Sequence, residues 1–327
     1  DLFAMPKAMN AGLFARRMSI TPGQYPAFAD CSVGSQPDPL TMRHVTRRYK
    51  LPPTAEERQL SAPTRWLDEL GVFSFALAAQ PDGAETYEPG LRDWFDDAQI
   101  LICRGVKTGR GLPFGVALKG GHNAEHHNHN DVGSYVVCVG KSMPLVDPGA
   151  EVYTRRTFSG ERYVSGVLNS FGHPVPRVAG QLQRTGRAAA AKVLAIDLTD
   201  DTDTVTFDLA APYPVKSLKS LKRTFTFSRV SGGLTVKDEV AFDGPESFGT
   251  AIVTQGGWER IAENRLRVGS GDEAVIVDID AGAHPMTITP TAIEEDIRGG
   301  LKPVRIGIDL KEPVREATIC VRVSPAK

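Results

Sequence analysis

The chain has 327 residues, of which 41% are hydrophobic and 24% charged, and its formal net charge is −1. This composition is ordinary for a globular protein, and a nearly neutral chain has no overall basic field that would favour nucleic acid or an anionic membrane as a partner. The length suits two domains, and no apolar run reaches the ~18 residues of a membrane-spanning helix. The first residue is Asp and no signal peptide follows it, so we expect the native chain to begin further upstream.

The first part of the chain, residues 1–97, predicts helices joined by loops rich in proline and glycine. Apolar residues in 2–18 recur with a roughly helical period. Several prolines and glycines exclude a long helix from 21–39. Short helices are expected over 41–49, from Thr54 onward and over 63–71.

Beyond Trp94 and Phe95 the helical period gives way to strands. A hairpin is indicated where Thr224–Ser228 turns through Ser231-Gly232-Gly233 into 234–240. The other expected strands are Ile100–Cys103, Phe114–Leu118, Tyr135–Val139, Thr204–Leu209, Ala274–Ile279, Met286–Ile288, Val304–Ile308 and Ala317–Val323. So many strands with glycine-rich turns predict a large antiparallel β-sandwich over 98–327. The continuous apolar character of 135–139 predicts burial on both faces of that strand.

Histidines are concentrated in one stretch. The chain has seven, of which four lie between residues 122 and 129 and a fifth is His173. His127 and His129 are two residues apart, and a strand would place them on the same side. With Asp147 they form a set that zinc favours, although other divalent metals accept the same ligands. The alternative is that these are solvated loop histidines and that Asp147 is a turn residue.

A basic, tyrosine-bearing run follows the histidines. Tyr153 and Tyr163 lie among Arg155, Arg156 and Arg162. Tyrosine can act as a general acid or base, and guanidinium neighbours favour the phenolate. They also suit capture of a carboxylate or sulfate, so an acidic sugar would explain the combination. The alternative is a solvated loop in which the tyrosines serve packing.

Three motifs in this region resemble the C-terminal β-sandwich domain of heparinase II/III-like proteins, which are polysaccharide lyases acting on heparin, heparan sulfate and alginate. They are Glu-His-His-Asn-His-Asn-Asp-Val-Gly-Ser-Tyr at 125–135, Leu-Val-Asp-Pro-Gly at 145–149 and Asn-Ser-Phe-Gly-His at 169–173. Upstream, Gly-Gln-Tyr-Pro-Ala-Phe-Ala-Asp at 23–30 looks like a loop from the last part of the family's helical toroid. The resemblance implies an α+β multidomain chain, in which the truncated end of an (α/α) toroid at 1–97 precedes the β-sandwich.

The resemblance also implies a reaction, β-elimination on a polysaccharide that contains uronic acid. His127 looks like the active-site histidine that acts at the uronate. Tyr163, with Tyr153 as the other candidate, looks like the tyrosine that protonates the leaving oxygen. The implied ligands of a structural zinc ion are His129, Asp147 and His173. The family's other catalytic Asn or His and Tyr lie in the toroid, upstream of anything that matches here.

The resemblance further implies an acidic polysaccharide or oligosaccharide as partner, a periplasmic or secreted location and a possible homo-oligomer. One alternative is a non-catalytic carbohydrate-binding or structural module that retains the zinc site. Another is a metal-dependent hydrolase. A calcium loop at 130–134 lacks the further acidic ligands, and a Ser-His-Asp hydrolase using Ser134 lacks the GxSxG elbow.

Overall fold

The computed structural model describes residues 4–59 and 86–326. The chain divides into two compact units, of which one comprises Asp1–Ser19 with Gln36–Gly90 and the other Ile20–Ser35 with Leu91–Lys327. This division differs from the single boundary expected after residue 97. The reason is that residues 20–35 and the strand at 92–95 both belong to the β-rich unit.

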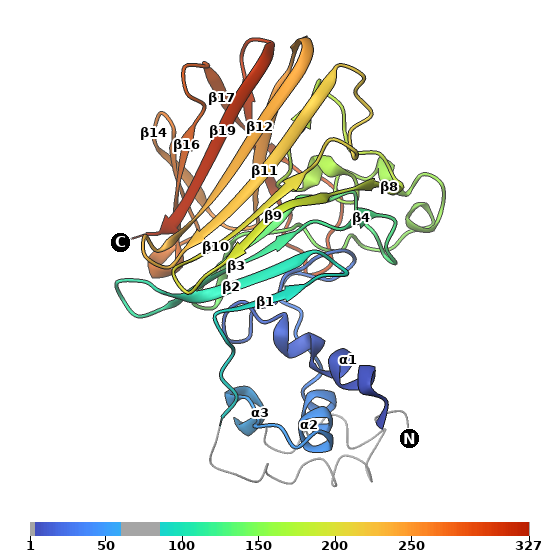
Figure 1. Cartoon of the computed structure of the whole chain (residues 1–327), viewed down its shortest axis with the longest axis vertical. Coiled ribbons are helices and arrows are strands. Elements are labelled where there is room, and N and C mark those ends of the chain that lie inside the picture. The colour runs from blue at the N-terminus through green and yellow to red at the C-terminus, as the bar shows by residue number, and fades with distance from the viewer. Residues whose placement is uncertain (1–3, 60–85, 327) are drawn as a thin grey trace. The chain divides into compact units, whose positions relative to one another are not determined.

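The first unit contains α1 (Pro6–Arg17), α2 (Pro39–Arg48) and α3 (Ala55–Gln59) (Figure 1). Both α1 and α2 begin with proline, and the Asp38 side chain caps α2 by accepting from the Thr41 amide at 2.7 Å. The expected helix at 63–71 lies outside the described residues. Within the described part of the chain the expected toroid helices are not present, because the prolines and glycines of 21–39 and 51–53 keep the helices short and separate.

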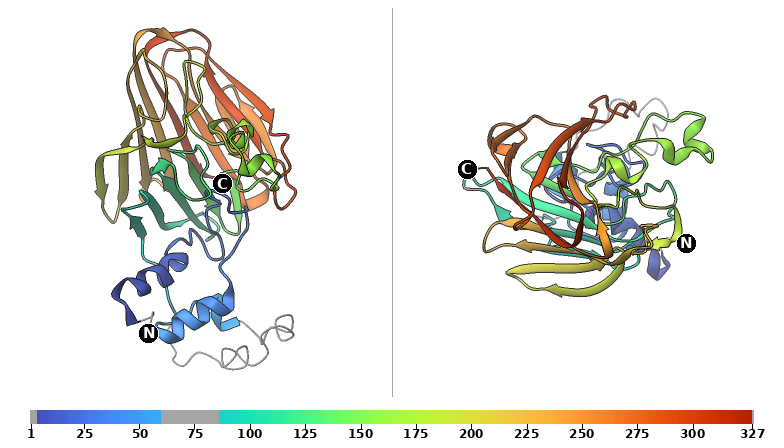
Figure 2. Two further views of the ribbon diagram at one scale, coloured as in Figure 1. Left: turned by 90° about the vertical axis from the view of Figure 1, so that its right-hand side faces the viewer. Right: turned by 90° about the horizontal axis from the view of Figure 1, so that it is seen from above.

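The second unit is built from antiparallel sheets, which confirms the predicted β-sandwich (Figure 2). A five-stranded sheet has the order β1 (Arg92–Phe95), β2 (Ile100–Lys107), β3 (Pro113–Lys119), β5 (Tyr135–Val139) and β6 (Ser142–Leu145). An eight-stranded sheet has the order β14 (Trp258–Ala262), β15 (Arg265–Val268), β16 (Val275–Asp280), β19 (Val314–Pro325), β12 (Gly233–Glu246), β11 (Leu218–Ser228), β10 (Thr202–Asp208) and β9 (Lys192–Leu198). A four-stranded sheet has the order β17 (Met286–Ala292), β18 (Val304–Leu310), β13 (Phe248–Thr254) and β7 (Arg177–Val178), and β4 (His122–Asn123) pairs with β8 (Gly186–Ala190).

The core is one apolar cluster to which the five-stranded, eight-stranded and four-stranded sheets all contribute buried residues. Alternate residues of β10, β11 and β12 are buried, as their polar–apolar alternation predicts, whereas all of β5 is buried. Phe114 of β3 stacks on Phe227 of β11 with ring centroids 5.9 Å apart, and Tyr135 of β5 meets Phe225 edge-on at 5.9 Å. Burial of each such ring contributes about 1.5–3 kcal/mol, so these contacts hold the sheets face to face.

The histidine-rich stretch and the segments after β6 form loops beside this core. Short 3-10 turns follow at Arg156–Phe158, Arg162–Val164 and Ser170–Gly172. Arg223 of β11 anchors two of these loops, because its guanidinium donates hydrogen bonds to the carbonyl oxygens of Gly133 and Pro174, each at 2.7 Å. The same side chain is buried and paired with Asp238 of β12. Two loops far apart in sequence are thereby held against one strand.

Candidate functional site

The structure brings together the three predicted metal ligands, His129, Asp147 and His173. All three are buried, and they offer ligand atoms that lie within 4.8 Å of one another. Each also keeps one buried polar atom without a hydrogen-bond partner among the described residues: Nδ1 of His129, Oδ1 of Asp147 and Nε2 of His173. A buried polar atom without a partner costs free energy, and two imidazole nitrogens with a carboxylate oxygen are a ligand set of zinc. The residues therefore fit a bound divalent cation.

The remaining atoms of these side chains are fixed by hydrogen bonds. Asp147 Oδ2 lies 2.8 Å from His173 Nδ1 and accepts from Ser134 Oγ at 2.7 Å. Burial acts to raise the pKa of Asp147, but the charge and hydrogen bond of His173 outweigh it and lower that pKa. Burial lowers the pKa of His129, which favours the neutral imidazole that a metal requires.

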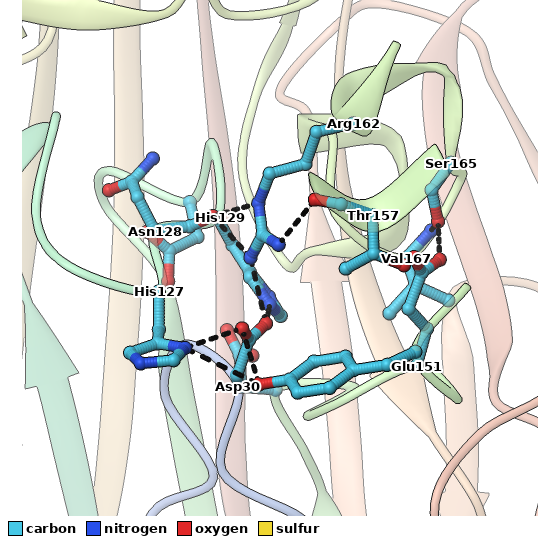
Figure 3. A network of polar contacts seen from close by, with 12 residues as sticks. Asp30, His127, Asn128, His129, Glu151, Thr157, Arg162, Ser165 and Val167 are labelled. Carbon is cyan, nitrogen blue, oxygen red and sulfur yellow. Dashed lines mark hydrogen bonds and ion pairs between the residues drawn. The ribbon is translucent and has the colours of Figure 1, made fainter. Parts of the chain in front are cut away.

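A second polar cluster, centred on Asp30, adjoins the first (Figure 3). Asp30 Oδ1 lies 3.0 Å from Nε2 of His129 and 2.8 Å from a guanidinium nitrogen of Arg162. Asp30 Oδ2 lies 3.0 Å from Nδ1 of His127 and accepts from the Tyr153 hydroxyl at 2.9 Å. Burial acts to raise the pKa of Asp30, but these four hydrogen bonds outweigh it and hold that pKa well below its usual range.

His127 and His129 point in different directions, which corrects the expectation that both lie on one side of a strand. They belong to a loop, and His127 has a left-handed backbone with a φ of 58°. The backbone reversal at His127 breaks the strand geometry on which that expectation relied. The His127 side chain is 64% exposed while that of His129 is 0% exposed. His127 can therefore meet a ligand from solvent, whereas His129 faces the buried cluster.

Tyr153 is the tyrosine that lies beside His127, with its hydroxyl 3.3 Å from Nδ1 of that ring. The guanidinium carbon of Arg298 lies 3.8 Å from the centroid of the Tyr153 ring. Burial and the adjacent Asp30 raise the pKa of Tyr153, although Arg298 and Arg162 act to lower it. The expectation that arginine neighbours would favour the phenolate is therefore wrong here, because the carboxylate of Asp30 outweighs them. Tyr153 stays protonated and can donate a proton.

The Tyr163 hydroxyl is engaged elsewhere. It donates to the backbone carbonyl of Asn128 at 3.3 Å and accepts from the Asn128 side-chain amide at 3.2 Å. Its ring packs against a small buried apolar cluster that includes Val167 and Leu168. The described contacts thus give Tyr163 a place in the loop packing, and they give Tyr153 the place beside His127.

The three arginines of the basic run diverge. Arg162 bonds to Asp30, and Arg156 pairs with the buried Glu151 at 2.8 Å. Arg155 is exposed and has no hydrogen bond or ion pair within residues 4–59 and 86–326. Of the three predicted substrate contacts, only Arg155 presents an unengaged cation.

Asp30 was not among the residues singled out from the sequence. Its partners His127 and Arg162 lie 97 and 132 residues further along the chain, so no local spacing connects them. The one feature of the sequence that could have drawn attention to Asp30 is the segment 23–30, which resembles a loop of heparinase II/III-like proteins and ends with this residue. In the structure, buried Ile20 and Ala27 anchor this segment.

The fold of this chain is similar to that of solved structures of heparinase III and of a heparan sulfate lyase. The heparinase III BT4657 gene product matches with a TM-score of 0.69 and 13% identity, over 96% of this chain and 46% of its own. Another structure of heparinase III matches with a TM-score of 0.65 and 15% identity, over 98% of this chain and 48% of its own. The heparan sulfate lyase HepC from Pedobacter heparinus matches with a TM-score of 0.62 and 13% identity, over 98% of this chain and 46% of its own. At these identities the likeness shows the fold alone, and this chain spans less than half of each of those proteins.

No family model matches the sequence, and no curated protein matches it. Among the helices of the described residues, none is long and apolar enough to cross a membrane.

Proposed function

We propose that this chain is the C-terminal part of a polysaccharide lyase that cleaves a uronic-acid-containing polysaccharide by β-elimination. The observation that carries the proposal is the pairing of an exposed His127 with a protonated Tyr153, 3.3 Å apart, beside the buried cluster of possible metal ligands. The fold likeness to heparin and heparan sulfate lyases supports the same reaction class.

In this reaction a base removes the proton on C5 of the uronate. The electron pair forms the C4–C5 double bond, the C4–O4 bond breaks, and an acid protonates O4. A cation or hydrogen-bond donor stabilises the carboxylate as it becomes enolate-like. The residue types needed are a base, a protonated acid and a cation.

In our assignment Tyr153 is the acid, because its raised pKa keeps it protonated. His127 acts at the C5 carboxylate or its proton, since its second ring nitrogen points away from Asp30 (Figure 3). The exposed Arg155 contacts a carboxylate or sulfate of the substrate.

We also propose one structural zinc ion held by His129, Asp147 and His173. The three unpartnered buried atoms of these residues support it. When bound, the ion would join three separate segments of the chain. Elemental analysis is expected to find one zinc per chain, lost in His129→Ala, and a metal-free wild type would remove the ion from the proposal.

The direct test is the ultraviolet absorbance of the unsaturated uronate product. It should be followed with heparin, heparan sulfate and alginate, using this chain and a longer protein that contains it. We expect a rise in absorbance that His127→Ala abolishes. If neither protein produces absorbance on any acidic glycan, the lyase proposal is rejected, and product without the chromophore would indicate a hydrolase.

A non-catalytic carbohydrate-binding module is the second candidate. It is favoured by the complete burial of His129, Asp147 and His173, which suits a structural role for their cluster. Binding of an acidic glycan without turnover, unchanged by Tyr153→Phe, would decide for this candidate.

A further inference from the structure

We propose that Asp30 is a positioning residue that joins the candidate metal site to the candidate catalytic pair and sets opposite tautomers on two histidines. The inference rests on the proposed function for the roles of His127 and Tyr153. Its geometric basis is independent of that function. One carboxylate oxygen, Oδ1, contacts His129, and the other, Oδ2, contacts His127 and Tyr153.

On the metal side, the contact dictates where the His129 proton lies. An ionised carboxylate can only accept hydrogen bonds, so a neutral His129 must carry its proton on Nε2, 3.0 Å from Asp30 Oδ1. The lone pair is then on Nδ1, the buried atom that has no partner among the described residues. When a metal-binding imidazole donates a hydrogen bond from its other ring nitrogen to a carboxylate, the bond fixes the orientation of the ring and makes the imidazole a stronger ligand. Asp30 therefore prepares His129 to bind a cation.

On the catalytic side, the same reasoning gives the opposite tautomer. His127 meets Asp30 through Nδ1, at 3.0 Å, so the proton of a neutral His127 lies on Nδ1. The lone pair of Nε2 is then directed away from Asp30 (Figure 3), on a side chain that is 64% exposed to solvent. Tyr153 donates to the same oxygen at 2.9 Å, which fixes the hydroxyl beside the His127 ring.

Arg162 makes this arrangement electrostatically favourable. Its guanidinium lies 2.8 Å from Asp30 Oδ1 and also donates to the backbone carbonyls of Asn128 and Thr157. The Asp30 side chain is 4% exposed, so its charge needs such a partner. Arg162 thus keeps Asp30 ionised without taking the oxygen that His127 and Tyr153 share.

The segment that carries Asp30 is held rigidly. Thr21 Oγ1 donates to the carbonyl of Gly140 at 2.9 Å. The carbonyl oxygen of Cys31 lies 2.7 Å from the place that a Cβ would occupy on Gly149, whose φ is 73°. Only glycine permits this approach. Asp30 is therefore fixed against the loop that follows Asp147, as a positioning role requires.

The first measurement needs no variant. Nitrogen-15 NMR of the histidine rings in the metal-free wild type should show His127 as the Nδ1–H tautomer and His129 as the Nε2–H tautomer. If both rings show the same tautomer, or exchange between the two, the proposal is overturned.

The second measurement compares Asp30→Asn with Glu151→Gln. Glu151 is a matched control because it is also a buried carboxylate of this region, yet it bonds to Arg156, Thr157 and Ser165 instead of the two histidines. In Asp30→Asn we expect zinc affinity, measured by chelator competition, to fall by about 10–100-fold. The ring signals of His127 should shift, and kcat should fall more than KM changes. In Glu151→Gln we expect wild-type zinc affinity and ring signals.

The outcomes separate this proposal from the proposed function. If the wild type has no lyase activity but Asp30→Asn still changes the tautomers and the zinc affinity, the lyase proposal fails and the role of Asp30 stands. If the wild type is active and Asp30→Asn leaves ring signals and zinc affinity unchanged, the role of Asp30 fails alone. Equal effects of Asp30→Asn and Glu151→Gln would reduce Asp30 to a packing role and overturn the proposal.

Discussion

At the scale of single residues, the site depends on which side chains share a carboxylate. Asp30 gathers His127, Tyr153 and Arg162 around one group. Tyr163 is excluded from this set because its hydroxyl is occupied by Asn128. The two tyrosines therefore have different chemical environments although they lie in the same run of sequence.

A matched pair of tyrosine variants tests this difference. Tyr153→Phe removes the hydroxyl that we propose protonates the leaving oxygen, so kcat should fall by about 10²–10⁴-fold, the usual worth of a general acid. Tyr163→Phe removes a hydroxyl that bonds to Asn128, so it should change kcat by less than about tenfold and act mainly on stability. Steady-state kinetics on the polysaccharide that gives the strongest wild-type absorbance would measure both. The reverse order of effects would assign the acid to Tyr163.

The sequence predicted the buried cluster better than its surroundings. The density of histidines marked this stretch, but the set His129, Asp147 and His173 was implied by the resemblance, because the spacing alone pointed to His127 and His129 with Asp147. Asp30 was not predicted because it is distant in sequence from His127 and Arg162, and only the fold places it beside them. Sequence spacing could not show which of Tyr153 and Tyr163 lies beside His127. The segment between them contains 3-10 turns, so distance along the chain does not predict distance in space.

At the scale of elements, one strand supports the site. Arg223 of β11 forms two hydrogen bonds with Asp238, each 2.6 Å long, and also holds the loops at Gly133 and Pro174. Gly133 directly precedes Ser134, and Pro174 directly follows His173. The strand therefore fixes parts of the candidate metal site.

Breaking this buried pair should be costly. Arg223→Leu leaves Asp238 buried without its partner, and the free energy of unfolding should fall by about 3–5 kcal/mol. The double variant Arg223→Leu/Asp238→Leu should recover part of that loss, because no unpaired charge remains. Urea unfolding would measure all three proteins. Lys219→Leu, which breaks an exposed pair with Asp243, is the control and should cost less than about 1 kcal/mol.

Two buried tyrosines of the β unit make a second contrast. The hydroxyl of Tyr213 donates to the carbonyl of Pro176 and accepts from the Gln183 amide at 3.3 Å, whereas the hydroxyl of Tyr135 has no partner among the described residues. At neutral pH, Tyr213→Phe should therefore lower the free energy of unfolding by about 1–3 kcal/mol, and Tyr135→Phe should leave it unchanged or raise it. Urea unfolding measures both, and a large loss in Tyr135→Phe would contradict the prediction.

These tyrosines also give a pH dependence with a definite sign. Burial raises the pKa of both phenols above the value of about 10 that they have in the unfolded chain. Above that pH the unfolded state loses protons that the folded state keeps, so stability should fall as pH rises through the folded pKa. The fall should be smaller in Tyr135→Phe than in the wild type, as urea unfolding at neutral pH and near pH 11 would show. An equal fall in both proteins would contradict this.

Strand prediction succeeded where one face of a strand is buried. The alternation in β10, β11 and β12 follows directly from their half-buried position. Strands such as β9 and β14 were not predicted, because they lie at the two edges of the eight-stranded sheet and most of their residues are exposed. Without a buried face their sequences carry no alternation to recognise.

At the scale of the whole molecule, the β unit is discontinuous in sequence. It consists of 20–35 and 91–327, separated by a stretch of the other unit. The first segment supplies Asp30, and the second supplies all three candidate metal ligands. The candidate site therefore depends on contacts between parts of the chain that are distant in sequence.

Such a site should couple metal binding to the stability of the β unit. An ion that binds only the folded state stabilises it by RT ln(1 + [L]/Kd), which is about 2.7 kcal/mol at a free zinc concentration of 100 Kd. We therefore expect the Tm to rise with added zinc and to fall when a chelator removes the metal. His129→Ala should show a lower Tm that neither zinc nor chelator changes, because one of the three ligands is missing. Calorimetric scans of both proteins, with zinc and with chelator, measure this. A wild-type Tm that does not respond to either addition would contradict the coupling, since ligands buried in three separate segments cannot bind an ion tightly without favouring the folded state.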